Sequence, residues 1–76
     1  MTEVECCEIF AGNLAQLMSE TGYSQSDLAY DAYLDQSTIS KYLKGDRLPT
    51  AKALINLCIV LECNFNDLLP DFDLIH

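Results

Sequence analysis

The chain has 76 residues, half of them apolar, and a formal net charge of −8. This length allows one domain, and the apolar content excludes a disordered chain. No apolar run approaches the ~20 residues that a membrane-spanning helix requires. The acidic start of the sequence lacks the features of a secretory signal, so we expect a cytoplasmic protein.

Five short helical patterns follow one another along the chain. The first covers about residues 5–20, and Gly22 ends it. Its apolar positions recur at spacings of three and four, as one buried face requires: Phe10, Leu14, Leu17 and Met18. The second helix begins at Ser24, whose hydroxyl can cap it, and Asp27 three residues later can complete a capping box.

The third and fourth helices are also bounded by capping residues. The third follows Asp35, a good N-cap, and Gly45 stops it. The fourth follows Pro49 and Thr50. Its apolar stripe consists of Leu54, Leu57, Cys58 and Leu61, and we expect this stripe to be widened by Ile55, Ile59 and Val60.

The fifth helix is short. Asn64 is expected to cap it, Asp67 three residues later can complete a capping box, and Pro70 ends it. We expect its inward side chains to be Phe65, Leu68 and Leu69. The tail, residues 71–76, alternates apolar residues with aspartates, which is typical of either a short strand or a segment that contacts a partner. The pattern as a whole predicts a compact all-α domain of five helices.

The four cysteines are Cys6, Cys7, Cys58 and Cys63. Their spacing is not that of a zinc site, and the only histidine is the last residue, so we expect reduced thiols and no metal. Cys58 falls on an apolar stripe and is expected in the core. No nucleophile–base pair and no glycine-rich phosphate loop appears, and we therefore expect no enzyme and no cofactor.

The positive charge is confined to one stretch of the sequence. Residues 36–52 contain all four basic side chains and one carboxylate, a net charge of +3, so the remainder carries −11. The basic residues are Lys41, Lys44, Arg47 and Lys52. Lysines are usually solvated surface residues, but their joint confinement favours a face that meets phosphate.

The connection between the second and third helices is very short, which predicts a steep crossing of the two helices. The third helix would then expose a polar face that suits the DNA major groove. We expect the base-reading residues to be Gln36, Ser37, Ser40 and Lys41. Phosphates would flank the end of this helix, where we place contacts from Tyr42, Lys44, Arg47 and Lys52.

The stretch SQSDLAYDAYLDQSTISKYLKG, residues 24–45, resembles the helix-turn-helix of the Cro and phage-repressor (XRE) family. Counting the flanking matches, the resemblance covers about residues 10–69, within a single domain of residues 1–76. It implies a lambda-repressor-like fold and a homodimer on a two-fold symmetric operator. It also implies a phosphate contact for Gln25, the first residue of the second helix.

Three features depart from the family pattern. Tyr33 and Glu62 occupy turn positions where glycine is usual, and a positive φ there would cost roughly 1 kcal/mol each. The first helix usually supplies basic residues to phosphate, but this chain has Asn13, Ala15 and Met18 at those places.

Two functional interpretations remain open at this point. The first is a sequence-specific DNA-binding transcriptional regulator, for which the resemblance implies a repressor. The second is a protein-interaction module or antitoxin-like protein with the same fold and weak or partner-dependent DNA binding. The acidic remainder and the apolar tail residues Phe72, Leu74 and Ile75 motivate the second interpretation.

Overall fold

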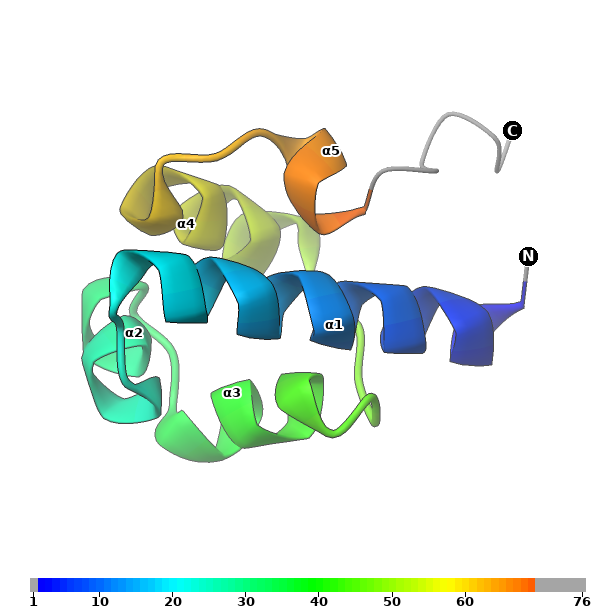
Figure 1. Cartoon of the computed structure of the whole chain (residues 1–76). Coiled ribbons are helices and arrows are strands. Elements are labelled where there is room, and N and C mark those ends of the chain that lie inside the picture. Colours follow the sequence, from blue (N-terminus) through cyan, green and yellow to red (C-terminus); the bar gives the residue numbers. More distant parts are fainter. Residues whose placement is uncertain (1, 70–76) are drawn as a thin grey trace.

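The computed structural model describes residues 2–69, which form five α-helices. They are α1 (Glu3–Thr21), α2 (Gln25–Asp31), α3 (Gln36–Leu43), α4 (Ala51–Leu61) and α5 (Phe65–Leu68). In Figure 1, α1 runs across the middle, with α3 on one side and α4 and α5 on the other, while α2 closes one end. The predicted all-α fold is confirmed. The predictions for Pro70 and for the tail fall outside the described residues.

The first helix begins two residues earlier than predicted. The Thr2 hydroxyl accepts a hydrogen bond from the Glu5 backbone N–H at 3.2 Å. In return, the Glu5 carboxylate accepts one from the Thr2 N–H at 3.3 Å. This reciprocal capping box satisfies two backbone donors that have no partner within the helix. The start was predicted from apolar periodicity, which carries no information about a polar cap.

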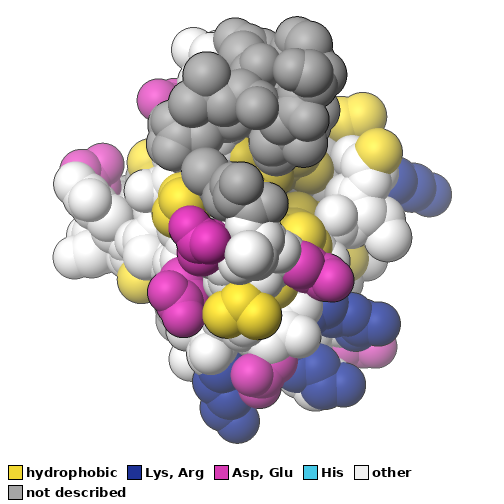
Figure 2. Space-filling view, turned by 90° about the vertical axis from the view of Figure 1, so that its right-hand side faces the viewer, with side chains coloured by type: hydrophobic (Ala, Val, Ile, Leu, Met, Phe, Trp, Pro, Cys, Tyr) yellow, Lys and Arg dark blue, Asp and Glu magenta, His cyan; other side chains and the backbone are white. Residues whose placement is uncertain are grey.

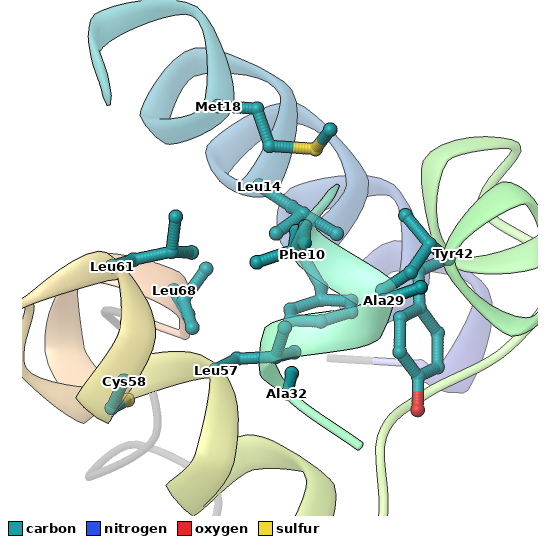
Figure 3. Close-up of a cluster of buried hydrophobic side chains, with 12 residues drawn as sticks. Phe10, Leu14, Met18, Ala29, Ala32, Tyr42, Leu57, Cys58, Leu61 and Leu68 are labelled. Carbon is teal, nitrogen blue, oxygen red and sulfur yellow. The ribbon is translucent and has the colours of Figure 1, made fainter. Parts of the chain in front are cut away.

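The core is centred on Phe10, whose side chain is fully buried. Its ring meets that of Tyr42 edge to face, with the centroids 5.3 Å apart and an angle of 77° between the planes. Figure 3 shows α1 contributing side chains to a cluster that α2, α3, α4 and α5 complete. The other large side chains that are fully buried are Leu14, Leu28, Ile39, Leu57 and Leu68. Every helix therefore has at least one anchor in a common core.

Three apolar residues expected in the core are exposed instead. Ile55 is 46% exposed, Ile59 69% and Phe65 51%. The predicted widening of the α4 stripe by the two isoleucines was wrong, because α4 buries only the side that carries Ala53, Leu57, Cys58 and Leu61. The inward placement of Phe65 was also wrong, since α5 has a single turn and Leu68 is its buried residue.

Three helices end in the same left-handed turn. Tyr33, Gly45 and Glu62 have φ values of 58°, 75° and 53°. In each case the next residue donates its N–H to a carbonyl five positions back, at 2.8 to 3.0 Å. This is the Schellman motif, in which glycine normally takes the left-handed position. Tyr33 and Glu62 thus have the positive φ at which a residue other than glycine is strained.

The Schellman turn at Glu62 also brings two thiols together. Cys63 donates its backbone N–H to the Cys58 carbonyl at 3.0 Å, and the side chains at these two positions characteristically touch. Cys58 is buried, as predicted. Burial, reinforced by the neighbouring Cys58 thiol, raises the pKa of Cys63 to about 12. A thiol with this pKa is protonated at neutral pH and is a poor nucleophile.

Two further findings concern residues 2–69. No three His, Cys, Asp or Glu side chains gather there in an arrangement that could hold a metal ion. No helix in the same range combines the length and apolar content needed to cross a membrane.

Replacing Glu62 by glycine should stabilise the fold by up to about 1 kcal/mol, because glycine relieves the strain at positive φ. Part of the gain is offset by the greater freedom of glycine in the unfolded chain. Urea unfolding measures the difference. Glu62→Ala is the matched control, since it removes the carboxylate but keeps the strain. Equal stabilisation by both variants would show that charge, and not the backbone, is responsible.

Candidate nucleic-acid interface

The start of α2 is fixed by Ser24. Its hydroxyl accepts a hydrogen bond from the Asp27 backbone N–H at 3.1 Å, as predicted. The structure shows no return bond from the Asp27 side chain, so the capping box is only half formed. This cap leaves Gln25 as the first residue of α2, with an exposed side chain. An exposed amide at a helix start can donate to an anion beside the terminus.

The turn between α2 and α3 is held by backbone and side-chain hydrogen bonds. The Leu34 N–H donates to the Ala29 carbonyl at 2.8 Å, across the left-handed Tyr33. Asn56 of α4 donates its side-chain amide to the Ala32 carbonyl at 3.2 Å. Ala29 and Ala32 are both buried, and their small side chains allow α2 to pack closely. These contacts establish the helix-turn-helix that the short connection predicted.

α3 presents a polar side to solvent while its other side is anchored in the core. Ile39 and Tyr42 are its buried residues. Of the predicted base-reading residues, Gln36, Ser37 and Lys41 are exposed, and Ser40 is half-buried. The Asp35 carbonyl accepts from the N–H groups of Thr38 and Ile39, at 3.0 and 3.2 Å. The Asp35 side chain makes no capping bond, contrary to prediction.

Tyr42 has both a core role and a polar end. Its side chain is 2% exposed, and Figure 3 shows the hydroxyl directed out of the labelled cluster. Burial raises the pKa of Tyr42, and the positive charge of Arg47 lowers it in part. Arg47 therefore lies within electrostatic reach of this hydroxyl.

The remaining basic side chains are also free to meet a ligand. Lys44, Arg47 and Lys52 are all exposed. Figure 2 views the molecule from the end where α3 finishes, and its Lys and Arg side chains occupy the lower and right-hand edges of that face. The Asp and Glu side chains lie mostly toward its centre and left. On this face the basic side chains therefore gather at the edge, with some Asp and Glu side chains among them at the lower margin.

None of the three α1 positions considered above carries a cation, and two of them serve the fold. Asn13 donates its side-chain amide to the Leu68 carbonyl at 2.8 Å, which ties α5 to α1. Met18 is buried in the core, and only Ala15 is exposed.

Two surface features were missed in the sequence. The first is a hollow bordered by the exposed side chains of Tyr30 and Tyr33, hereafter the tyrosine hollow. The only sequence signal for it was an aromatic residue at a turn position that favours glycine. The second, hereafter the α4–α5 groove, is an apolar depression lined by Cys6, Leu48, Pro49, Ala51, Leu54, Ile55, Phe65 and Leu69. Periodicity had assigned Ile55 and Phe65 to the core.

Comparison with solved structures finds two restriction-modification controller proteins and a transcriptional regulator. The restriction-modification controller protein C.AhdI from Aeromonas hydrophila superposes with a TM-score of 0.77 at 26% identity, over 82% of this chain and 94% of that one. A mutant of the restriction-modification controller protein C.Esp1396I gives a TM-score of 0.76 at 28% identity, over 93% and 94%. An HTH_3-family transcriptional regulator from Vibrio cholerae shares the fold, with a TM-score of 0.83 at 20% identity, over 97% of this chain but 42% of that one.

Sequence comparison gives a consistent result at the level of families. The family model of the Cro/C1-type HTH DNA-binding domain matches residues 13–72. The search of curated proteins gave no match.

Removing the Asn13 amide should destabilise the protein without involving DNA. Asn13→Ala loses the hydrogen bond to Leu68 and leaves a partly buried carbonyl without its donor, at a cost of about 1 kcal/mol. Gln16→Ala is the control on the same helix, because the bond from Gln16 to Glu20 is exposed and should contribute little. Thermal or urea unfolding compares the two. Similar stabilities would contradict the structural role of Asn13.

Proposed function

This chain belongs to the family of Cro/C1-type helix-turn-helix DNA-binding domains, and from that premise we propose that it is a sequence-specific transcriptional regulator. It acts as a homodimeric repressor that binds a two-fold symmetric operator through α3. Its similarity to two restriction-modification controller proteins, over most of the chain, supports a regulatory role. Repression follows if the operator overlaps a promoter, where a bound dimer excludes the polymerase.

The observation that carries the proposal is the coincidence of polar side chains and positive charge on one face. α3 exposes Gln36, Ser37 and Lys41, and Lys44 follows at its end. Every basic residue of the chain lies in α3 or within the nine residues after it. An otherwise acidic protein is repelled by DNA, so approach is favourable through this face only.

We assign base reading to the exposed side of α3. The Gln36 amide can bond both edge atoms of adenine, and Lys41 can reach the acceptors of guanine. Ser37 and Ser40 provide hydroxyls that accept or donate. Because the N-terminal residues of a recognition helix contact base edges, Gln36 should contribute most to specificity.

Phosphate contacts surround this reading face. Gln25 at the start of α2 can donate to the backbone of the DNA, aided by the helix dipole. Lys44, Arg47 and Lys52 supply positive charge beyond the end of α3. The Tyr42 hydroxyl, whose pKa is raised by burial and lowered in part by the Arg47 charge, is a further hydrogen-bond donor. These contacts set register and affinity and carry no sequence information.

Replacing Gln36 by alanine should weaken specific binding by about 1–3 kcal/mol and relax the base preference at one position of each half-site. Selection of duplexes from a random library, at low and near-physiological salt, measures both effects. The wild-type protein should enrich a two-fold symmetric motif.

The matched control is Gln16→Ala, which removes an exposed glutamine from α1 and should select the same motif as the wild type. Unchanged selectivity of Gln36→Ala would contradict the assignment of this residue. If the wild-type protein enriches no motif at either salt concentration, the proposal of a sequence-specific regulator fails.

A homodimer requires a surface at which two copies meet, and we assign it to the α4–α5 groove. Ile55 and Phe65 line it and are about half exposed, and they share the groove with further apolar side chains. A contiguous exposed apolar surface of this kind is typical of a protein–protein contact. None of the proposed DNA-contacting residues lines the groove. Two copies joined there leave both α3 helices free for two half-sites.

Phe65→Asp should convert the dimer into a monomer, because it places a charge in an apolar contact. Ala15→Asp adds the same charge at an exposed position outside the groove and should leave the dimer intact. Sedimentation of both variants and of the wild type measures the mass. A wild-type monomer, or a Phe65→Asp dimer as stable as the control, would refute this assignment. The wild-type protein would be a monomer, for example, if residues 70–76 of the same chain occupied the groove.

A further inference from the structure

Two neighbouring tyrosines project into solvent without contributing to the core. Tyr30 is 84% exposed and Tyr33 88%. Tyr33 also holds a left-handed conformation that glycine would adopt without strain. Stability therefore explains neither aromatic side chain. Exposed aromatic residues at the edge of a concave surface are typical of recognition sites.

The tyrosine hollow lies where the end of α2 meets the end of α4. Tyr23, Asp31, Leu34 and Val60 line it together with the two exposed tyrosines. Burial, and after it the nearby Asp31 carboxylate, raises the pKa of Tyr23. The negative charges of Glu62 and Asp27 also raise the pKa of Tyr23. The hollow thus combines aromatic side chains with a negative potential.

No basic residue lines the hollow. The basic residue nearest to it in sequence is Lys41, which lies in α3 with an exposed side chain. A nucleic acid is a poor occupant, because the carboxylates repel phosphate. A guanidinium group suits both the aromatic side chains and the negative potential of the hollow, since it stacks on aromatic rings and pairs with carboxylates.

We propose that the tyrosine hollow is a docking site for an arginine-containing basic segment of a partner protein. The guanidinium stacks against Tyr30 and Tyr33 and pairs with Asp31. This function goes beyond DNA binding, because none of the residues assigned to DNA contact lines the hollow. The protein can therefore hold its operator and the partner at the same time.

The test uses the isolated protein without DNA. The probe is the peptide acetyl-Gly-Arg-Gly-Arg-Gly-amide, titrated while backbone amide shifts are recorded. We expect saturable shifts at Tyr23, Tyr30, Asp31 and Tyr33. The matched lysine peptide should bind more weakly, because an ammonium group does not stack as a planar guanidinium does.

Variants locate the binding site. Tyr30→Ala and Tyr33→Gly should each weaken arginine-peptide binding by about three-fold, as expected for loss of one exposed cation–π contact. Tyr33→Gly should fold at least as well as the wild type, so its loss of binding cannot be attributed to unfolding. Tyr30→Ala, which does not touch the turn between α2 and α3, should keep the operator affinity of the wild type.

Three results would overturn the inference. One is shifts spread over the acidic residues of α1 in place of the hollow. Another is equal binding of the arginine and lysine peptides with no effect of either variant. The third is loss of operator affinity in Tyr30→Ala with unchanged peptide binding, which would make Tyr30 a DNA contact. Because the peptide titration contains no DNA, its failure leaves the proposed regulatory function intact.

Discussion

The left-handed turn at Tyr33 is the constraint on which the DNA-binding geometry depends. The bond from the Leu34 N–H to the Ala29 carbonyl closes α2 and directs the chain at once into α3. The buried side chains of Ala29 and Ala32 permit α2 to pack closely. Asn56 of α4 fixes the end of α2 by a hydrogen bond to the Ala32 carbonyl. A residue other than glycine at this position is strained, so the surrounding packing must fix the turn.

The core transmits this constraint to the exposed side of α3. Phe10 from α1 packs against Tyr42, and Ile39 is fully buried one turn earlier. With both anchors fixed, the polar side chains of α3 have one outward orientation. The same arrangement places Lys44 and Arg47 beyond the helix end, where their charge is not neutralised by a described ion pair. An acidic protein can thereby present one face to a polyanion.

Much of this architecture could be predicted from the sequence, because caps and apolar spacing are local signals. Ser24, Thr50 and Gly22 mark helix boundaries that the structure confirms. Ile55 and Phe65 could not be placed, since α4 is apolar around most of its circumference and periodicity does not tell which side meets the core. The side-chain hydrogen bonds of Asn13 and Asn56 join residues that are 55 and 24 positions apart in the sequence, and no local pattern reveals such contacts. The tyrosine hollow likewise combines residues from two connections and two helices.

The salt dependence of DNA binding tests the central claim, that the basic face of α3 and the following segment meets phosphate. With four basic side chains per chain, log K should fall with log salt at a slope between zero and about −3.6 per chain, or −0.9 for each phosphate neutralised. Lys44→Gln should make the slope shallower by about 0.9 per chain. A slope of zero, or one that Lys44→Gln leaves unchanged together with the affinity, would contradict the account.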